Sequence, residues 1–246
     1  MLNYKVHLSY DGTCYSGFQV QQNATTIQGV LQQVLQVLYK REIKVTGAGR
    51  TDAGVHAREQ VVSFKAPPFI PLAKLPLALN SMLPPDIRVW HAEIVADNFN
   101  ACRSAREKTY RYTIDTGFYP DVFRRLYTWH YPQEVDFAKL EEAARYLVGT
   151  HDFTAFKAAG SKVKNNIRTI TDFKLLHKGN FVVMQFTGDG FLYKMVRIMI
   201  GTLLEIGQNK KARPEDIEKI LQARDRDKAG VTAPPHGLCL WSIKYR

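Results

Sequence analysis

The chain has 246 residues, of which 45% are hydrophobic and 23% are charged. These fractions exclude a largely disordered, collagen-like or low-complexity protein, and the length is enough for one large domain or two of ordinary size. The 34 Lys and Arg residues outnumber the 23 Asp and Glu residues and give a formal net charge of +11, which favours a polyanionic partner, most simply nucleic acid.

The cysteines and the apolar segments indicate a cytoplasmic protein that does not span a membrane. The three cysteines, Cys14, Cys102 and Cys239, are far apart and form no CxxC pair, which argues against a disulfide framework or a zinc knuckle. Lys5 interrupts the N-terminal segment where a signal peptide needs an apolar run. Charged residues also interrupt the longest apolar stretch, 191–206.

The first half of the chain is predicted to form a β-α-β-β-α-β unit. Tyr4, Val6 and Leu8 alternate as in a strand, and Thr25 with Gln28 has the spacing of a helix capping box. The predicted elements are a strand at 4–10, a helix at 27–38, strands at 43–46 and 60–65, a helix at 71–82 and a strand at 87–93.

The second half of the chain repeats nearly the same order. The predicted elements are a strand at 109–115, a helix at 137–148, a hairpin of strands at 167–176 and 181–187, helices at 191–206 and 214–223, and a strand at 238–244. We therefore predict an α+β fold of two ferredoxin-like halves, residues 1–103 and 104–246, that share an extended and mainly antiparallel sheet.

A glycine-rich loop at 47–57 is the most informative segment of the sequence. It places Arg50, Asp52 and His56 between glycines, after one predicted strand and before another. The spacing alone is compatible both with an ordinary surface turn and with a functional loop. A dinucleotide fingerprint and a P-loop are excluded, because the third glycine of the first and the Gly-Lys-Ser/Thr of the second are missing.

The loop also carries a resemblance to a known family. Residues 49–57, Gly-Arg-Thr-Asp-Ala-Gly-Val-His-Ala, resemble the signature of the tRNA pseudouridine synthase A family. Further matches follow in the order of the family at 10–12, 60–62, 99–101, 103–105, 110–112, 151–153 and 190–197. Phe18 and Cys102 depart from the usual family residues, but neither lies in the signature.

The resemblance implies the pseudouridine synthase fold and a specific reaction. Members of this family isomerise uridine to pseudouridine at positions 38, 39 and 40 of the tRNA anticodon stem-loop. The base is detached at N1 and rejoined through C5, so nothing is added and neither a cofactor nor a metal is expected. The expected partners are tRNA and a second copy of the chain in a homodimer.

The resemblance also assigns roles to four residues. Asp52 matches the catalytic nucleophile, and a carboxylate can both attack and leave, as it does in glycosidases. A nearby guanidinium group favours ionised Asp52, and Arg50 and Arg197 are the candidates, of which Arg197 is the better match to the active-site arginine. Tyr110 matches the active-site tyrosine, which can stack on uracil or move a proton. Arg50 is expected to fill the gap that a flipped-out base leaves; His56 is expected to be structural.

A basic stretch near the middle of the second half is a candidate phosphate contact. Lys162, Lys164 and Arg168 lie close together in a predicted loop before a strand. Such a run is usually a solvated surface, but a tRNA substrate makes phosphate binding a reasonable expectation.

Two other functions remain open from the sequence. A non-catalytic RNA-binding module could use sheet aromatics such as Tyr110 and Tyr112 to stack bases, but it would gain nothing from the Asp52 carboxylate. A nucleoside hydrolase could use the same aspartate with water, and it would release free uracil.

Overall fold

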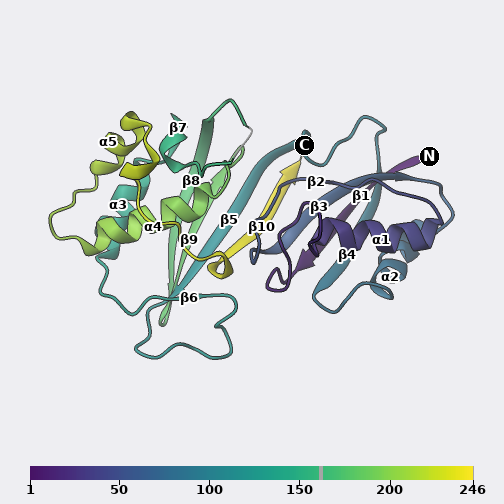
Figure 1. Cartoon of the computed structure of the whole chain (residues 1–246), viewed down its shortest axis with the longest axis horizontal. Coiled ribbons are helices and arrows are strands. Elements are labelled where there is room, and N and C mark those ends of the chain that lie inside the picture. Colours follow the sequence, from purple (N-terminus) through teal and green to yellow (C-terminus); the bar gives the residue numbers. More distant parts are fainter. Residues whose placement is uncertain (161–162, 246) are drawn as a thin grey trace. The chain divides into compact units, whose positions relative to one another are not determined.

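The structure is a computed structural model and describes residues 1–160 and 163–245. The chain divides into two compact units, which we call unit 1 (Met1–Arg106 with Cys239–Arg246) and unit 2 (Glu107–Leu238). Each unit combines helices with strands that pair mainly antiparallel (Figure 1), so the predicted α+β class is confirmed. The division into folding domains at 103/104 stays a prediction, and the compact units differ from it by placing the last strand with the first unit.

Unit 1 is built on a sheet in the order β4-β1-β3-β10, with the short β2 also paired to β3. Strand β1 is antiparallel to both β3 and β4, and β10 is parallel to β3. The elements are β1 (Leu2–Tyr10), α1 (Ile27–Tyr39), β2 (Thr46–Gly47), β3 (His56–Ala66), a 3₁₀ turn (Leu72–Lys74), α2 (Leu75–Asn80), β4 (Ile87–Val95) and β10 (Leu238–Tyr245).

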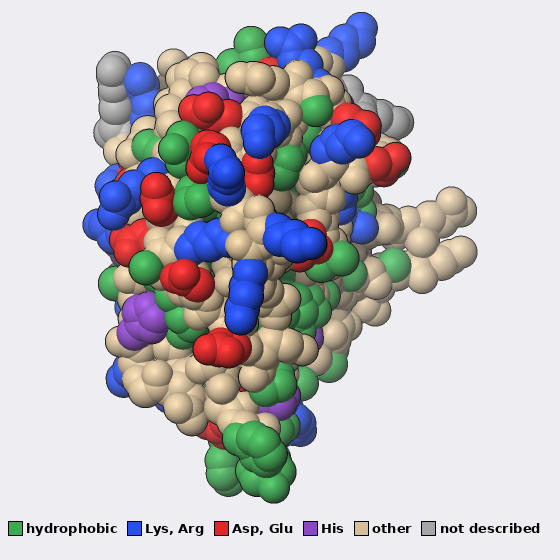
Figure 2. Space-filling model, turned by 90° about the vertical axis from the view of Figure 1, so that its left-hand side faces the viewer, with side chains coloured by type: hydrophobic (Ala, Val, Ile, Leu, Met, Phe, Trp, Pro, Cys, Tyr) green, Lys and Arg blue, Asp and Glu red, His purple; other side chains and the backbone are tan. Residues whose placement is uncertain are grey.

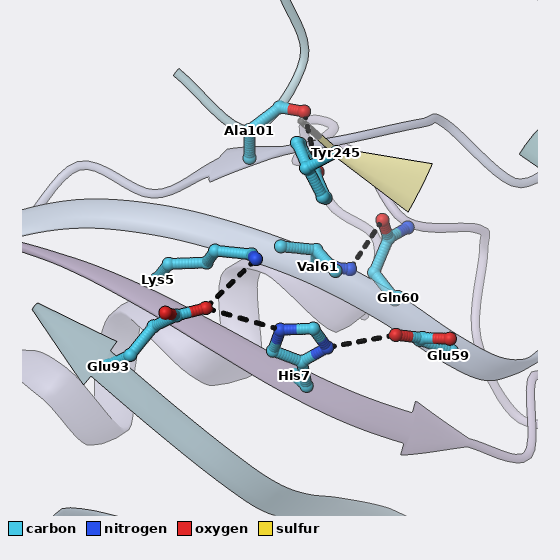
Figure 3. Close-up of polar contacts among 8 residues, drawn as sticks. All are labelled: Lys5, His7, Glu59, Gln60, Val61, Glu93, Ala101 and Tyr245. Atoms are coloured by element: carbon cyan, nitrogen blue, oxygen red, sulfur yellow. Dashed lines mark hydrogen bonds and ion pairs between the residues drawn. The ribbon is translucent and has the colours of Figure 1, made fainter. Parts of the chain in front are cut away.

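The two faces of β1 have different environments, as alternation along the strand predicts. Tyr4, Val6 and Leu8 are buried in the core of unit 1. The opposite face is polar: Lys5 Nζ lies 2.9 Å from Glu93 Oε1, and His7 Nδ1 lies 2.9 Å from Glu59 Oε1 (Figure 3). Burial lowers the pKa of His7 below its usual value, so at neutral pH the His7–Glu59 contact is a hydrogen bond from a neutral ring.

The structure corrects two local predictions around α1. The predicted strand at 43–46 is reduced to Thr46–Gly47, because side chains of α1 bind the Val45 backbone: Val45 N–H donates to Gln32 Oε1 at 3.2 Å, and Gln28 Nε2 donates to the Val45 carbonyl at 2.8 Å. The predicted capping box is wrong, because the N-cap is Thr26. The Gln28 side chain instead binds the backbone of Val20 and Val45.

Unit 2 has a second sheet region in the order β5-β9-β8-β7, with β6 parallel to β5 and the other pairs antiparallel. The predicted hairpin is confirmed as β8 and β9, while β6 and β7 are short strands that the sequence did not indicate. The elements are β5 (Ala105–Asp115), β6 (Trp129–His130), α3 (Phe137–Arg145), β7 (Gly149–Asp152), β8 (Ile167–Lys178), β9 (Phe181–Gly188), α4 (Met195–Gln208), α5 (Asp216–Ala223) and 3₁₀ turns at Thr154–Phe156, Arg226–Lys228 and Pro235–Gly237.

Helix α4 is the central helix of unit 2. It packs against α3 (Figure 1), and twelve of its fourteen residues are buried. Its apolar side chains therefore form part of the hydrophobic core of unit 2. Within the described residues, no helix combines the length and apolar character that crossing a bilayer requires.

Candidate active site

Asp52 lies in the loop between β2 and β3, as the sequence predicts. It opens a tight turn in which the Val55 N–H donates to the Asp52 carbonyl oxygen at 3.1 Å. Gly54 closes this turn with φ 75°, a backbone conformation that residues with side chains rarely adopt. The Asp52 side chain is half-buried. The turn therefore holds a carboxylate in a defined position without sealing it in the core.

The loop at 11–18 supports this turn from one side through the backbone. The Phe18 N–H donates to the Thr51 carbonyl at 3.1 Å, and the Gly54 N–H donates to the Tyr15 carbonyl at 3.2 Å. These bonds bracket Asp52 in the chain. The position of its Cα is thus fixed by main-chain contacts that do not involve its own side chain.

A buried polar network supports the turn from the other side. The hydroxyls of Tyr10 and Thr51 lie 2.7 Å apart, and Gln60 Nε2 donates to the Gly49 carbonyl at 2.8 Å and to the Tyr10 hydroxyl at 3.4 Å. Burial raises the pKa of Tyr10 well above its usual value, so this hydroxyl stays protonated. All three residues lie in segments that match the family signature or its further motifs, but no supporting role was predicted for them. Gln60 was a second signal, because it is a polar residue at the start of an apolar strand.

His56 holds the neighbouring turn in place, in agreement with the structural role predicted for it. Its ring is buried, and Nδ1 lies 3.0 Å from the Gly12 N and 3.1 Å from Asp11 Oδ1. One nitrogen cannot accept from Gly12 and donate to Asp11 at the same time. With its lone pair on Nδ1 the ring accepts from the Gly12 N–H, and with a hydrogen on Nδ1 it donates to Asp11, so either arrangement ties β3 to residues 11–12.

Arg50 lies on the same loop, two residues before Asp52, and its side chain is exposed. The structure thus places a guanidinium group on the surface of the loop that presents the carboxylate.

Arg197 lies in the first turn of α4 in unit 2 and is buried. Its Nε donates to the Ala233 carbonyl at 2.7 Å, and the Ala233 N–H donates to the Arg197 carbonyl at 3.1 Å. Burial raises the pKa of the adjacent Tyr112, and the positive charge of Arg197 acts in the opposite direction. The Tyr112 hydroxyl donates to the Pro234 carbonyl at 2.9 Å.

The 230–233 segment runs along α4 and sets the position of Arg197. The Gly230 N–H donates to Thr202 Oγ1 at 2.9 Å, and the Val231 N–H donates to Glu205 Oε1 at 2.8 Å. One residue before Thr202, a Cβ atom on Gly201 would overlap the Val231 carbonyl oxygen. The segment can approach the helix only because residue 201 is glycine.

Tyr110 lies on β5 of unit 2 and is buried. Its ring meets the ring of Phe191 edge to face, with centroids 5.1 Å apart. Tyr110 is paired across the sheet with Phe186 of β9. The ring is therefore fixed by aromatic packing.

The candidate residues thus fall into two groups. Asp52 and Arg50 share one loop of unit 1, while Tyr110 and Arg197 belong to β5 and α4 of unit 2.

The predicted basic stretch is only partly described. Lys162 lies outside the described residues. Lys164 is exposed, whereas Arg168 is half-buried and donates from Nη1 to the Asn165 carbonyl at 3.0 Å. Of the two, Lys164 therefore has the side chain that is more accessible to solvent. Across residues 1–160 and 163–245, no three His, Cys, Asp or Glu side chains are grouped as metal ligands would be.

Comparison with known proteins gives one consistent family. A family profile described as tRNA pseudouridine synthase matches residues 7–103 and 143–246. Asp52, Arg50 and Arg197 lie within these ranges, and Tyr110 lies between them. The chain is 50% identical over 243 residues to "tRNA pseudouridine synthase A" of Bacillus licheniformis, covering 98% of each chain.

Two other relatives of the same name are similar over the same span. The chain is 49% identical to the protein of Moorella thermoacetica and 46% identical to that of Bacillus subtilis, again over 243 residues and 98% of each chain. Among solved structures, the archaeal box H/ACA sRNP Nop10–Cbf5 complex aligns with 82% of this chain and 43% of that chain, at 12% identity and a TM-score of 0.35.

Proposed function

The chain belongs to the tRNA pseudouridine synthase family, and from this premise we propose that it isomerises uridine to pseudouridine at positions 38, 39 and 40 of the tRNA anticodon stem-loop, with Asp52 as the nucleophile. The observation that carries the proposal is the turn at Asp52. The sequence that resembles the family signature folds into a loop that fixes a half-buried carboxylate by backbone bonds on both sides.

The reaction requires a group that bonds to the substrate and then leaves. The N1–C1′ bond of uridine breaks, a C5–C1′ bond forms, C5 loses a proton and N1 gains one, so the reaction is balanced without a co-reactant. A carboxylate can form an ester at the sugar or an adduct at the base and then depart. Asp52 is the carboxylate that the loop presents for this step, whichever of the two atoms it attacks.

Arg197 and Tyr110 are proposed to act on the same uridine. The bond from Arg197 Nε to the Ala233 carbonyl orients the planar guanidinium group. Such a group can stabilise the negative charge of a carboxylate through paired donors. Tyr110 is held edge to face by Phe191. Its ring can stack on uracil, and its hydroxyl can take part in the proton transfer from C5 to N1.

Arg50 is proposed to act on the RNA stem. A base within a stem must leave the stack before its glycosidic bond can be attacked. Its departure costs stacking energy, and a side chain that fills the gap in the stem offsets part of this cost. The exposure of the Arg50 side chain, two residues from Asp52 on the same loop, supports this role.

The proposal includes a homodimer and a cytoplasmic location. The homodimer is expected from the family resemblance. The location is supported by the cysteines, since Cys14, Cys102 and Cys239 are all free thiols, as is usual in a reducing compartment.

The alternatives are separable in one experiment. The protein is incubated with an unmodified tRNA transcript and no added cofactor, and pseudouridine and free uracil are measured by mass spectrometry after digestion, with chemical mapping of the position. We expect pseudouridine at 38–40 and no uracil. Free uracil would indicate a nucleoside hydrolase, and tRNA binding with neither product would indicate a passive RNA-binding module.

A further inference from the structure

Arg50 lies between two residues that are bonded to the sheet of unit 1. The Gly49 carbonyl accepts from Gln60 Nε2 of β3 at 2.8 Å, and the Thr51 hydroxyl lies 2.7 Å from that of Tyr10 on β1. Gln60 and Thr51 are buried, whereas the Arg50 side chain is exposed. The backbone is therefore held on both sides of an exposed arginine.

The Gln60 side chain continues the pairing of β2 with β3 beyond the end of β2. Residues 46–48 bond to β3 through the backbone. At Gly49 the bond to β3 comes instead from the Gln60 amide. The oxygen of this amide accepts from the Val61 N–H at 3.2 Å (Figure 3). The amide is thus fixed at both ends, and it holds the first residue of the loop that the strand ladder no longer reaches.

The guanidinium group of Arg50 has no anchor of its own. It forms no ion pair and no hydrogen bond within residues 1–160 and 163–245. Other surface cations lie beside carboxylates: Figure 2 shows acidic and basic side chains interspersed on one face, and Lys219 Nζ lies 2.6 Å from Asp216 Oδ1. The direction in which the Arg50 side chain projects therefore depends on the backbone of residues 49–51.

The Asp52 turn has supports that do not pass through Gln60. Backbone N–H and carbonyl groups of residues 11–18 bond to the backbone of Thr51 and Gly54, on either side of Asp52. Loss of the Gln60 amide would therefore release the chain before the arginine, while these bonds still hold the carboxylate. The two functional side chains of the loop are positioned by separate contacts.

We propose that Gln60 is a positioning residue for base extrusion, which holds the loop so that Arg50 enters the RNA stem as the target uridine leaves it. This inference rests on the proposed function, in which Arg50 fills the gap left by the base. Gln60 is fully buried, so it acts through the loop and does not touch the RNA. A side chain that is already directed outward loses less entropy when it enters the stem.

The Tyr10 hydroxyl completes the arrangement. It lies 3.4 Å from Gln60 Nε2 and 2.7 Å from the Thr51 hydroxyl, so it can accept from the first and donate to the second. We call Gln60 and Tyr10 the Arg50 clamp, because one holds the residue before Arg50 and the other holds the residue after it.

Two RNA transcripts separate base extrusion from chemistry. In the first, the target uridine is paired with adenine in the anticodon stem. In the second, a pyrimidine opposite the target leaves it unpaired. Extrusion costs least for an unpaired base, so a defect in extrusion should disappear on the second transcript, whereas a defect in chemistry should persist on both. Pseudouridine formation is measured in single turnover with saturating protein.

Gln60→Met keeps the length of the side chain and removes both N–H donors. Its rate on the paired transcript should fall by roughly 10- to 100-fold, the cost of a small misplacement. On the unpaired transcript the rate should stay within about twofold of wild type, because little extrusion is needed. Tyr10→Phe should show the same pattern with a smaller loss, since Gly49 remains bonded, and it carries the test if Gln60→Met does not fold.

A double-mutant cycle tests whether Gln60 acts through Arg50. Arg50→Ala should also lose activity on the paired transcript. If the clamp acts only by directing this arginine, adding Gln60→Met to Arg50→Ala should cause no further loss. Losses that multiply would show that Gln60 acts independently of Arg50 and would overturn the proposal.

The matched control is Asn3→Leu. Asn3 is a buried amide on β1 whose Nδ2 donates to the carbonyls of Ala96 and Phe99 at 2.9 Å each, so the same kind of bond is lost elsewhere in unit 1. It should slow neither transcript. Equal losses for Gln60→Met on both transcripts, no loss on the paired one, or the same pattern in Asn3→Leu would contradict the inference. Circular dichroism checks that each variant is folded.

Base extrusion is also followed without chemistry, so that this inference and the proposed function can fail separately. The fluorescence of 2-aminopurine placed opposite the target rises when the uridine leaves the stem. A slower rise with Gln60→Met than with wild type supports the clamp even if no pseudouridine forms, a result that would refute the reaction. Wild-type pseudouridine formation with equal rises in both proteins would leave the reaction standing and refute the clamp.

Discussion

The Asp52 turn and the Arg197 site are held in place by different means. Asp52 is positioned by a turn of consecutive residues, closed by its own carbonyl and by Gly54. Arg197 is positioned by Ala233, a residue 36 positions later in the chain, on a segment that must lie against α4. The comparison teaches that a short motif can specify the local turn that carries a nucleophile, which bonds from residues 11–18 then support, whereas the orientation of its expected partner depends on packing against a distant segment.

The largest expected effect is that of Asp52→Asn. The amide has the shape of the carboxylate and the backbone bonds of the turn do not use the side chain, so fold and tRNA affinity should persist. Activity should fall by about 10⁴-fold or more, as when a nucleophile is removed. Pseudouridine formation is measured in single turnover.

The matched control for this prediction is Asp97→Asn. Asp97 is an exposed carboxylate paired with Lys65 at 2.5 Å, and its loss should leave the rate unchanged. Retention of more than a few per cent of wild-type turnover in Asp52→Asn would show that Asp52 is not the nucleophile.

Arg197→Lys should have the next largest effect. Lysine keeps the charge but lacks the Nε–H that binds the Ala233 carbonyl and the planar pair of donors. The single-turnover rate should fall by roughly 10²–10³-fold, the range for loss of one preorganised donor. Arg213→Lys, at an exposed position, is the control. An unchanged rate in Arg197→Lys would remove this residue from the chemistry.

Tyr110→Phe tests the second residue of unit 2. The ring and its edge contact with Phe191 remain, so tRNA affinity should be retained. We expect the single-turnover rate to fall by about 10²-fold, as for loss of a proton-transfer group. Full activity in Tyr110→Phe would show that the reaction requires the ring of Tyr110 and not its hydroxyl. Full activity in Tyr110→Leu would contradict both roles.

Gly201→Ala tests the tertiary support of Arg197 without touching the arginine. The new methyl group would overlap the Val231 carbonyl oxygen and displace the 230–233 segment. We expect thermal unfolding to show a loss of about 1–3 kcal/mol of stability, as for overpacking. The chemical step should slow roughly tenfold, within the cost of a small misplacement. A variant with the wild-type rate would mean that the segment does not govern Arg197.

The smallest effect is expected at the surface, for Lys164→Ala. If this exposed side chain binds a phosphate, the slope of log affinity against log salt should become shallower by roughly 0.7–0.9. The modified position should not change. Lys74→Ala, at an exposed position of unit 1, is the control. A filter-binding titration that gives the wild-type slope and affinity would make Lys164 a solvated residue.

Periodicity in the sequence was enough to find most of the long helices and strands. Strand β1, helix α1 and the β8–β9 hairpin lie where the apolar pattern predicts them, because each buries one regular face. It failed at 43–45. The pattern there is strand-like, but Gln28 and Gln32 of α1 satisfy the Val45 backbone. The local pattern of residues 43–45 does not indicate that side chains of the preceding helix bind the Val45 backbone.

The sequence by itself determined the α+β class, the family and the loop that carries Asp52. These depend on alternation, on glycine at a position of positive φ, and on a contiguous motif, all of which are local properties of the chain. Only the tertiary structure decided that Tyr10, Thr51 and Gln60 form one buried network and that the 230–233 segment fixes Arg197. Buried polar groups must find partners wherever packing brings them, and that choice is made by contacts between distant parts of the chain rather than by their neighbours in sequence.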